Sequence, residues 1–517
     1  KYNENYSRLY DDPTDPRYVH PDSLNVSGYH YRVAGTNLNR FARNTKSIIA
    51  KWDITSQIDK HNLPKVGIEV QADDLSYENI TLVPAKTALG REIVPFIPSI
   101  DGVESTNHDL FQRTPFKVSA YAQDKIELDN MIINIGLRLE TFDPNGKTPV
   151  DPSDPDIYNP FKLEHRYHDL NGDGQIGLAE EVASNAITVA ERETYWYKKA
   201  SRKTSLSPRL GIAYPITDKG IIRFSYGIFE QIPEYSQLYQ GDQYKLVSAQ
   251  QGVQGPYGNN DLKPQRSTIY EIGLQQQMTD NIAVDVTGFY RDIRDWISSS
   301  QPIPTFLAGL SYSQRINRDF ANVRGITLSV KRRWAQNFSF GIDYTFQVAD
   351  GTNSTPDQEF YAQQNGQEPT KTLAPLSWDQ THTLNGNIFI GNEQQGISII
   401  AAVSSGQPYT PTRLTGSNTG KNVMAGLVQN SGRKPYIARF DVEAFKNFSF
   451  SGVDVQLFVR AFNVFDRKNP INVFGDTGLA DYTLQQVEIS GYDKGWFDLP
   501  TNFSEPRSVY LGTKISL

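Results

Sequence analysis

The sequence contains no cysteine among its 517 residues. This absence excludes a scaffold held by disulfides and zinc sites built on cysteine thiolates. It suits a protein of the cell envelope, because such a protein cannot depend on a reducing compartment.

Long apolar runs are also absent. No stretch approaches the run of about 18 apolar residues that indicates a membrane-spanning helix. The hydrophobic content of 38% and the mean hydropathy of −0.51 resemble those of a soluble protein. Only helical membrane proteins are excluded, because a membrane-spanning β-strand needs about 9 to 11 residues with half of them apolar.

Signals of catalysis and of nucleic-acid binding are missing as well. The net charge of −7 argues against nucleic acid as the main partner. The chain has no HExxH zinc motif, no Gly-x-Ser-x-Gly elbow, no P-loop and no dinucleotide fingerprint. We therefore expect neither an enzyme nor a nucleic-acid-binding protein.

The chain does contain segments in which apolar and polar residues strictly alternate. In NFSFGIDYTFQV (337–348), Phe338, Phe340 and Ile342 fall on one face of a strand, with Ser339 and Asp343 on the other. The same alternation recurs along the chain. It predicts strands at about 43–57, 65–78, 116–127, 131–143, 206–214, 220–230, 267–277, 282–295, 320–333, 337–349, 377–391, 396–406, 436–446, 452–466 and 507–517.

The connections between these strands alternate between tight turns and long loops. Turns such as LDN (128–130) and NEQQG (392–396) are each followed by a long loop, for example 144–205 and 231–266. A single strand of this kind fits a soluble sheet equally well. Long loops confined to one side are typical of outer-membrane barrels, which have short periplasmic turns and long extracellular loops. The pattern therefore favours an all-β fold, a transmembrane antiparallel β-barrel.

The strand count predicts that part of the barrel lies upstream. About 15 strands are found, whereas single-chain bacterial barrels have an even number. The last strand runs from a long loop to the periplasmic side, so residues 1–42 are expected to be an extracellular loop region. Residues 43–517 are then the C-terminal portion of a larger barrel.

One loop matches a calcium-binding pattern at every position. DLNGDGQIGLAE (169–180) fits D-x-[DN]-x-[DN]-G-x5-E. A calcium ion would be held by Asp169, Asn171, Asp173, the backbone carbonyl of Gln175 and a bidentate Glu180. EF-hands usually occur as paired helix–loop–helix units, and this loop lies within a long insertion. We therefore expect a structural calcium site that stiffens the extracellular loop 144–205.

Several segments resemble the TonB-dependent outer-membrane receptors, especially their carboxypeptidase-regulatory-like or SusC-like type. They are WDITSQIDKHNLPKVGIE (52–69), YAQDKIEL (121–128), SPRLGIAYPITDKGIIRFSYGIFEQIP (207–233), NNDLKPQRSTIYEIGL (259–274), ANVRGITLSVKRR (321–333), WDQTHTLNGN (378–387), VRAFNVFDRKNP (459–470) and the final EPRSVYLGTKISL. The resemblance implies a barrel of about 22 strands in the bacterial outer membrane, with its lumen blocked by an N-terminal plug. Neither the plug nor the TonB box is found in this sequence.

The resemblance implies active import driven by the TonB complex, of a metal chelate, vitamin, glycan or peptide. The alternative is a structural barrel whose loops anchor surface lipoproteins or a secretion or motility complex. A soluble secreted β protein is a third and weaker interpretation. A surface lipoprotein is a candidate partner in addition to the TonB complex and the lipid bilayer.

Two further groups of residues are of interest. Lumen-facing charges are expected to line the plug interface, namely Arg138, Glu140, Arg223, Glu271 and Arg460. Loop aromatics form either a surface for a ligand or partner, or the packing within the loops themselves, namely Tyr235, Tyr239, Tyr244, Tyr257, Phe306, Tyr312 and Tyr361. His382, in WDQTHTLN, is expected to begin a strand.

Overall fold

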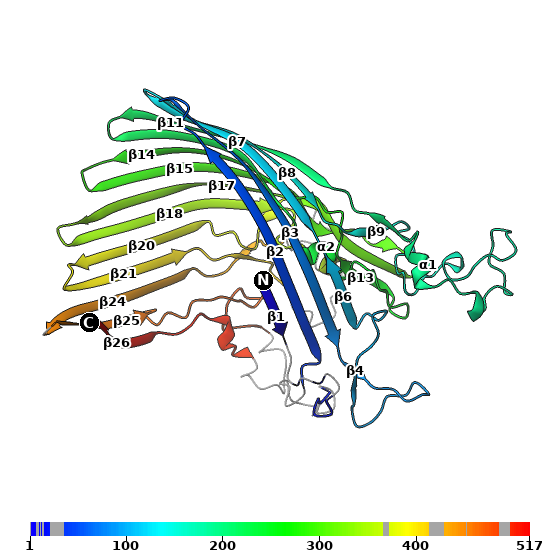
Figure 1. Cartoon of the computed structure of the whole chain (residues 1–517). Helices are drawn as coiled ribbons and strands as arrows, with labels where there is room; N and C mark the ends of the chain where they lie inside the picture. The colour runs from blue at the N-terminus through cyan, green and yellow to red at the C-terminus, as the bar shows by residue number, and fades with distance from the viewer. Residues whose placement is uncertain are drawn as a thin grey trace.

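The computed structural model describes residues 2–6, 10, 12, 15–20, 36–364, 372–412, 429–450, 452–484 and 497–516. These residues form one large, curved antiparallel sheet with long connections at one of its ends (Figure 1). Among them, no helix combines the length and apolar character needed to cross a membrane.

All of the strands expected from the alternation are present. They are β2 (Asn39–Thr55), β3 (Asn62–Thr81), β7 (Phe116–Leu128), β8 (Met131–Asp143), β11 (Lys203–Thr217), β12 (Gly220–Gln231), β14 (Gln265–Gln277), β15 (Ile282–Ser299), β17 (Leu310–Ala335), β18 (Phe338–Gly351), β20 (His382–Gly391), β21 (Gln395–Ser404), β24 (Ile437–Phe450), β25 (Val453–Phe462) and β26 (Ser508–Ser516). His382 begins β20, as expected.

The connections between the long strands contain short strands and helices. The strands are β4 (Val83–Pro84), β5 (Pro98–Ser99), β6 (His108–Arg113), β9 (Lys147–Pro149), β10 (Tyr197–Lys199), β13 (Gly252–Tyr257), β16 (Ile303–Pro304), β19 (Ala374–Pro375), β22 (Pro408–Tyr409) and β23 (Gly432–Arg433). The helices are α1 (Val189–Glu193), α2 (Tyr235–Tyr239) and α3 (Gln358–Gln364), with single 3-10 turns η2 (Leu163–His165), η3 (Ala183–Asn185) and η6 (Pro500–Asn502).

The start of the chain differs from the expectation of a loop over residues 1–42. Residues Tyr2–Tyr6 form strand β1, which pairs antiparallel with β2 from Tyr2 opposite Thr45 to Tyr6 opposite Phe41. β2 itself begins at Asn39. The segment YNENY is too short for its alternation to be recognised from the sequence alone. Its pairing with β2 specifies the strand. Residues 21–35 of this region lie outside the described residues.

Strand β17 is longer than the alternation predicts. It spans Leu310–Ala335 rather than 320–333. Its first residues pair in parallel with β13, with Gly252 opposite Leu310 and Gln254 opposite Tyr312. The rest of the extension pairs antiparallel with the end of β15, from Ser299 opposite Arg315 to Trp296 opposite Asp319. The extension therefore depends on two partner strands, which the local pattern does not contain.

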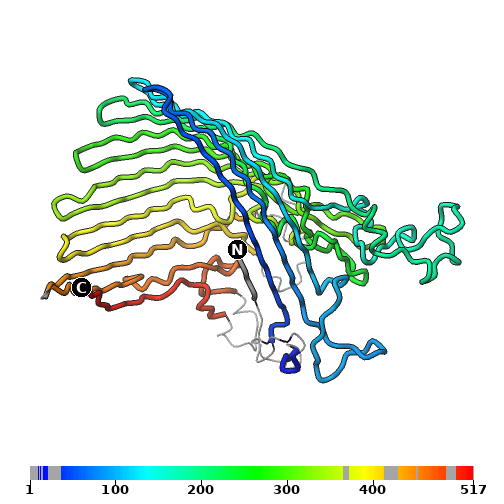
Figure 2. The backbone as a smooth tube through the Cα atoms, in the orientation of Figure 1, coloured from blue at the N-terminus to red at the C-terminus, as the bar shows by residue number. Residues whose placement is uncertain are grey.

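Consecutive long strands pair with one another throughout the sheet. The series of antiparallel pairings runs from β1–β2 to β25–β26, and within the described residues no pairing joins β26 to β1. The tight turns lie together at one end of the strands, and the long connections gather at the other end (Figure 2). The expected segregation of turns and loops is confirmed.

The register places the apolar residues of adjacent strands on one face. Trp52 lies opposite Ile68, which lies opposite Ala120, which in turn lies opposite Leu139. Large hydrophobic side chains on this outer face are exposed, including Trp52, Ile68, Leu139, Leu206, Ile272, Ile326, Ile342 and Leu511. A soluble sheet would cover such a face, whereas a membrane barrel exposes it to lipid.

Candidate functional site

The inner face of the sheet carries polar and charged residues that pair with one another within and between strands. Arg138 Nη2 donates to Glu140 Oε2 at 3.1 Å, and Ser119 Oγ donates to the same oxygen at 3.1 Å. Arg460 Nε donates to Glu443 Oε2 at 2.8 Å. Because all of these side chains alternate with the apolar ones, the charged wall and the apolar wall are two sides of the same strands.

The expected lumen-facing charges are thus found on one face, each with a partner. Arg223 forms an ion pair with Asp285 and donates to Thr287 Oγ1 at 3.2 Å. Glu271 accepts a hydrogen bond from Ser225 Oγ at 3.0 Å. Their acidic partners Asp285 and Glu443 were not identified from the sequence, although the same alternation places both on this face.

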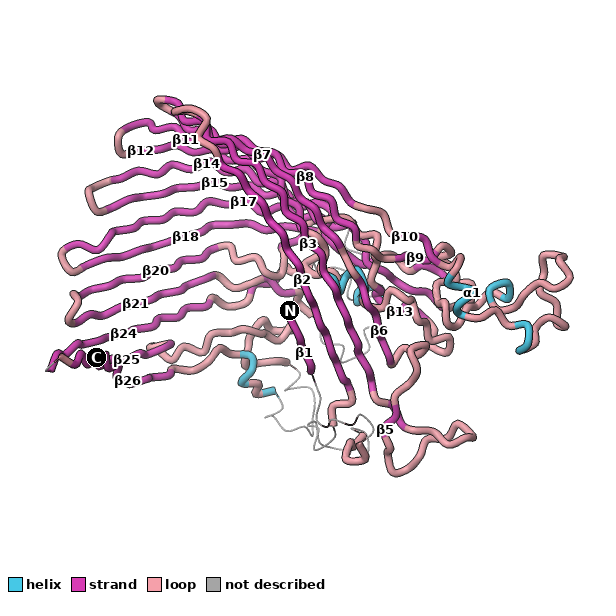
Figure 3. Tube along the Cα trace, in the orientation of Figure 1, coloured by secondary structure: helices cyan, strands magenta, loops and turns pink. Residues whose placement is uncertain are grey.

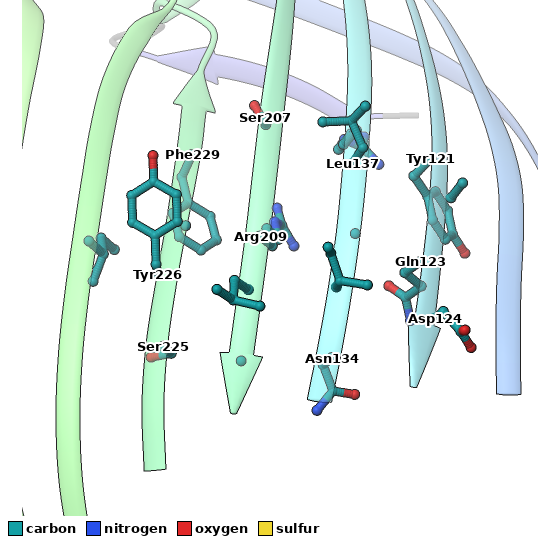
Figure 4. A pocket seen from close by; sticks show the side chains of 18 of the residues that line it. Tyr121, Gln123, Asp124, Asn134, Leu137, Ser207, Arg209, Ser225, Tyr226 and Phe229 are labelled. Atoms are coloured by element: carbon teal, nitrogen blue, oxygen red, sulfur yellow. The ribbon is translucent and has the colours of Figure 1, made fainter. Parts of the chain in front are cut away.

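A cavity of about 510 Å³ lies against the inner wall where β7, β8, β11 and β12 meet (Figure 4). Its lining combines Tyr121, Arg209 and Phe229 with Asn134 and Gln123. Two wall positions are glycines for steric reasons. A Cβ at Gly136 would lie 2.9 Å from the Gln123 Cβ, and one at Gly227 would lie 2.8 Å from the Phe229 ring. The hollow therefore exists because small residues leave space beside large ones.

The connection between β12 and β14 folds inward onto the wall. Its helix α2 packs Leu238 and Tyr239 in a buried cluster with Leu75, Phe111 and Phe142, which belong to β3, β6 and β8. The α2 residue Tyr235 donates a hydrogen bond to the buried carboxylate of Asp73 on β3. Tyr239 donates to the backbone carbonyl of Pro144 at 2.6 Å. We call residues 232–264 the inner segment.

A buried ion pair also attaches the inner segment to the wall. Arg113 Nη2 lies 2.6 Å from Asp242 Oδ2, and Asp242 is only 3% exposed. Asn260 Nδ2 donates to the same carboxylate oxygen at 2.9 Å. The sequence contains no signal for this pair. Arg113 and Asp242 are more than a hundred residues apart, both lie outside the strands predicted from the sequence, and single charges of this kind are usually solvated.

The loop aromatics mostly pack within the loops. Tyr239, Tyr244 and Tyr312 are buried, and Tyr244 contacts the ring of Tyr312 edge-on with centroids 5.6 Å apart. Phe306 and Tyr361 remain exposed. Of the two interpretations left open by the sequence, packing within the loops therefore holds for Tyr244 and Tyr312, whereas Tyr239 packs against the strands of the wall.

The long connection from β8 to β11 forms a separate projecting unit, which we call the lobe (residues 144–202). The ribbon of β9 and β10 closes its base, with Tyr197 opposite Pro149. Inside it, the fully buried Asp154 accepts a hydrogen bond from His165 Nδ1 at 2.8 Å. At its base, burial would raise the pKa of Asp151, but hydrogen bonds from Lys162 and Ser153 outweigh this and lower that pKa to about 2.

The predicted calcium loop lies in the lobe with its side chains bonded to backbone amides. Asp169 Oδ2 accepts from Gly174 N at 2.8 Å, and Gly174 has a φ of +81° that favours glycine. Asp173 Oδ1 accepts from Gln175 N at 2.8 Å. Across the described residues, no three His, Asp or Glu side chains converge as metal ligands. The turn geometry expected for the loop is present, and its carboxylates are directed at amides.

This combination of features defines a class of protein. One face of the sheet is apolar and exposed, the other is polar and paired, and the turns and loops are segregated to opposite ends. In hydrocarbon every backbone amide must be paired, so sheets of this kind cross membranes as barrels, and they do so in bacterial outer membranes.

The family model described as TonB dependent receptor-like, beta-barrel matches residues 1–464. The chain belongs to this family, whose barrels lie in the bacterial outer membrane and are not enzymes. The match identifies the family and not the SusC-like type within it. Among curated proteins, no match was found.

Solved structures with a similar fold are also outer-membrane receptors. The outer-membrane transporter YddB from Escherichia coli superposes with a TM-score of 0.58 at 12% identity, covering 92% of this chain and 54% of that one. The ferric citrate transporter FecA superposes with a TM-score of 0.52 at 12% sequence identity, covering 92% of this chain and 55% of that one. The ferripyoverdine receptor of Pseudomonas aeruginosa superposes with a TM-score of 0.53 at 12% sequence identity, covering 92% of this chain and 49% of that one. The chain thus spans about half the length of these structures.

Proposed function

We propose that the protein is an outer-membrane importer energised by the TonB complex. The observation that supports it is the inner wall of paired charges, such as Arg138 with Glu140 and Arg460 with Glu443, backed by an apolar outer wall of the same strands. Such a wall lines an aqueous path through a bilayer. Within the described residues β1 and β26 each pair on one side only, and further strands of the whole receptor would join their other edges, because an open edge in hydrocarbon leaves amides unpaired.

The substrate would be a metal chelate, vitamin, glycan or peptide, too large or too scarce for passive diffusion. Ferric citrate and ferripyoverdine are named for proteins of similar fold. At 12% identity this similarity concerns the fold and does not choose among the substrate classes. A surface lipoprotein is a further proposed partner on the extracellular side.

Transport is tested with the whole receptor in cells that carry or lack TonB. We expect uptake of one labelled compound from a panel of these four classes. Uptake should fall to the level of receptor-free cells when TonB is deleted or the proton gradient is collapsed. Uptake that persists without TonB would refute energised import, as would a receptor that transports none of the panel.

We also propose that the loop 169–180 binds Ca²⁺ structurally through Asp169, Asn171, Asp173, the carbonyl of Gln175 and Glu180. The spacing of oxygen ligands and the glycine turn support it. Binding would require Asp169, Asp173 and Glu180, which accept backbone hydrogen bonds, to turn toward a common centre, and the ion would then replace these bonds in holding the loop together. The ion would stiffen the lobe and take no part in chemistry.

Chelation of calcium is expected to increase protease cleavage within the lobe and leave the barrel folded. The variant Glu180→Gln should be cleaved rapidly with or without chelator, because it lacks the bidentate ligand. Glu193→Gln, an exposed carboxylate of the same lobe, is the matched control and should respond like the wild type. Identical cleavage of the wild type in calcium and in chelator would exclude the site.

A further inference from the structure

The lobe is anchored at its base and free at its tip. Tyr312 donates a hydrogen bond to the Pro152 carbonyl at 2.9 Å, and Leu246 N donates to Asp156 Oδ2 at 3.0 Å. These contacts tie the base to strand β17 and to the connection between β12 and β14. The part around α1 projects beyond the other loops, at the end of the molecule away from the tight turns (Figure 3). Its surface is therefore remote from the lipid-facing strands.

Two leucines of the lobe, both in the segment 169–180, are largely exposed. Leu170 is 70% exposed and Leu178 is 88% exposed. Between them lies the buried carboxylate of Glu180, whose Oε1 accepts from Leu170 N at 2.7 Å and whose Oε2 accepts from Gly177 N at 2.9 Å. Since Leu178 directly follows Gly177, a single carboxylate holds both leucines close together. Val182, whose backbone N–H donates to the Glu180 carbonyl at 2.8 Å, adds a third exposed apolar side chain in this part of the lobe.

These leucines are held outward by a supported backbone. Asn185 Nδ2 donates to the Glu180 carbonyl at 2.9 Å and to the His168 carbonyl at 2.8 Å, which fixes both ends of the loop. Glu180 and Asn185 are themselves buried. An apolar pair that is fixed in position before binding loses little conformational entropy when a partner covers it. This is the property expected of anchor residues in an interface.

The charge around the leucines indicates the chemistry of the partner. The lobe, residues 144–202, contains ten Asp and Glu and seven Lys and Arg, but four of these cations, Lys147, Lys198, Lys199 and Arg202, lie near its two ends. Residues 151–196 between them contain all ten Asp and Glu and only three Lys and Arg. This segment alone accounts for a net charge as negative as that of the whole chain, and one bound divalent cation would leave it negative. Charge complementarity then favours a partner with basic residues around an apolar site, and it disfavours an anionic membrane surface.

We propose that Leu170 and Leu178 anchor a docking surface for a partner protein that presents an apolar site flanked by Lys and Arg. The projecting lobe is the arm that carries this surface above the barrel mouth. Transport is not required for the docking, so the proposal stands or falls separately from the import function.

The test uses the whole receptor in intact cells, with the photo-crosslinking residue p-benzoylphenylalanine placed at 170, at 178 or at 89. Leu89 is the matched control, because it is 84% exposed on another loop whose neighbours Lys86, Arg91 and Glu92 are not acidic overall. Positions 170 and 178 should give an adduct with the same partner protein, joined through a peptide with more Lys and Arg than Asp and Glu. Position 89 should give none with that protein.

A second variant separates docking from simple proximity. With the crosslinker at 182, Leu170→Ser combined with Leu178→Ser should reduce the adduct at least tenfold, while heat-modifiable gel mobility of the barrel stays unchanged. The proposal is overturned by the absence of an adduct at 170 and 178, or by an adduct with a second copy of this chain, with lipopolysaccharide or with an acidic peptide. An adduct at 182 that survives the double substitution also overturns it.

Discussion

Arginine in place of Ile342 is expected to destabilise the membrane-inserted receptor by about 2 to 4 kcal/mol. Ile342 lies in the middle of β18, opposite Val330 on one side and Gly386 on the other, and its side chain is exposed on the apolar face. If that face touches lipid tails, the guanidinium must be dehydrated or must distort the bilayer. Equilibrium unfolding in lipid vesicles measures the loss.

The matched control for this substitution is Gln347→Arg. Gln347 lies on the same strand with the opposite side-chain direction, facing the polar wall. We expect it to change the free energy of unfolding by less than about 1 kcal/mol, because the side chain remains hydrated. Equal effects of the two arginines would contradict the assignment of the faces.

Removal of the Arg113 side chain is expected to release the inner segment from the wall. Arg113→Ala leaves the buried carboxylate of Asp242 with Asn260 as its remaining neutral donor. Breaking a buried ion pair in this way costs about 3 to 5 kcal/mol. A loss of about 3 kcal/mol accelerates amide hydrogen exchange about a hundredfold where exchange requires local opening, so residues 232–264 should show it.

Two comparisons test the reason for this effect. Lys125→Ala removes an ion pair with Glu127 in which both side chains are substantially exposed, so it should cost at most about 1 kcal/mol. The double variant Arg113→Met with Asp242→Leu removes both charges, and it should restore most of the protection. Slow exchange in Arg113→Ala, equal to that of the wild type, would show that the pair does not hold the inner segment.

The sequence predicted the strands and their faces well, because both follow from a local pattern. Each strand contains its own alternation of apolar and polar residues. A shift of the register by one residue would turn Ile342 to the polar face and Asp343 to the apolar face. The same logic placed Arg138, Arg223 and Arg460 on the inner wall. It also indicated that the turns and loops lie on opposite sides.

Features that depend on long-range contacts could not be predicted from the sequence. The pairing of β1 with β2, the extension of β17 by β13 and the Arg113–Asp242 pair each join segments that carry no local signal of one another. The inward fold of α2 is of the same kind, because its buried Tyr239 resembles an exposed loop aromatic until its partners on β3, β6 and β8 are known.

A membrane barrel requires that the apolar face contacts lipid tails, and spin labels on β18 measure this contact directly. A nitroxide at position 342 should be relaxed strongly by oxygen, which concentrates in hydrocarbon, and weakly by a water-soluble nickel chelate. A nitroxide at position 347 should show the lower oxygen and higher nickel accessibility of a hydrated wall. Equal accessibility of the two positions to the nickel chelate in vesicles would mean that water reaches both faces, and the membrane barrel would be refuted.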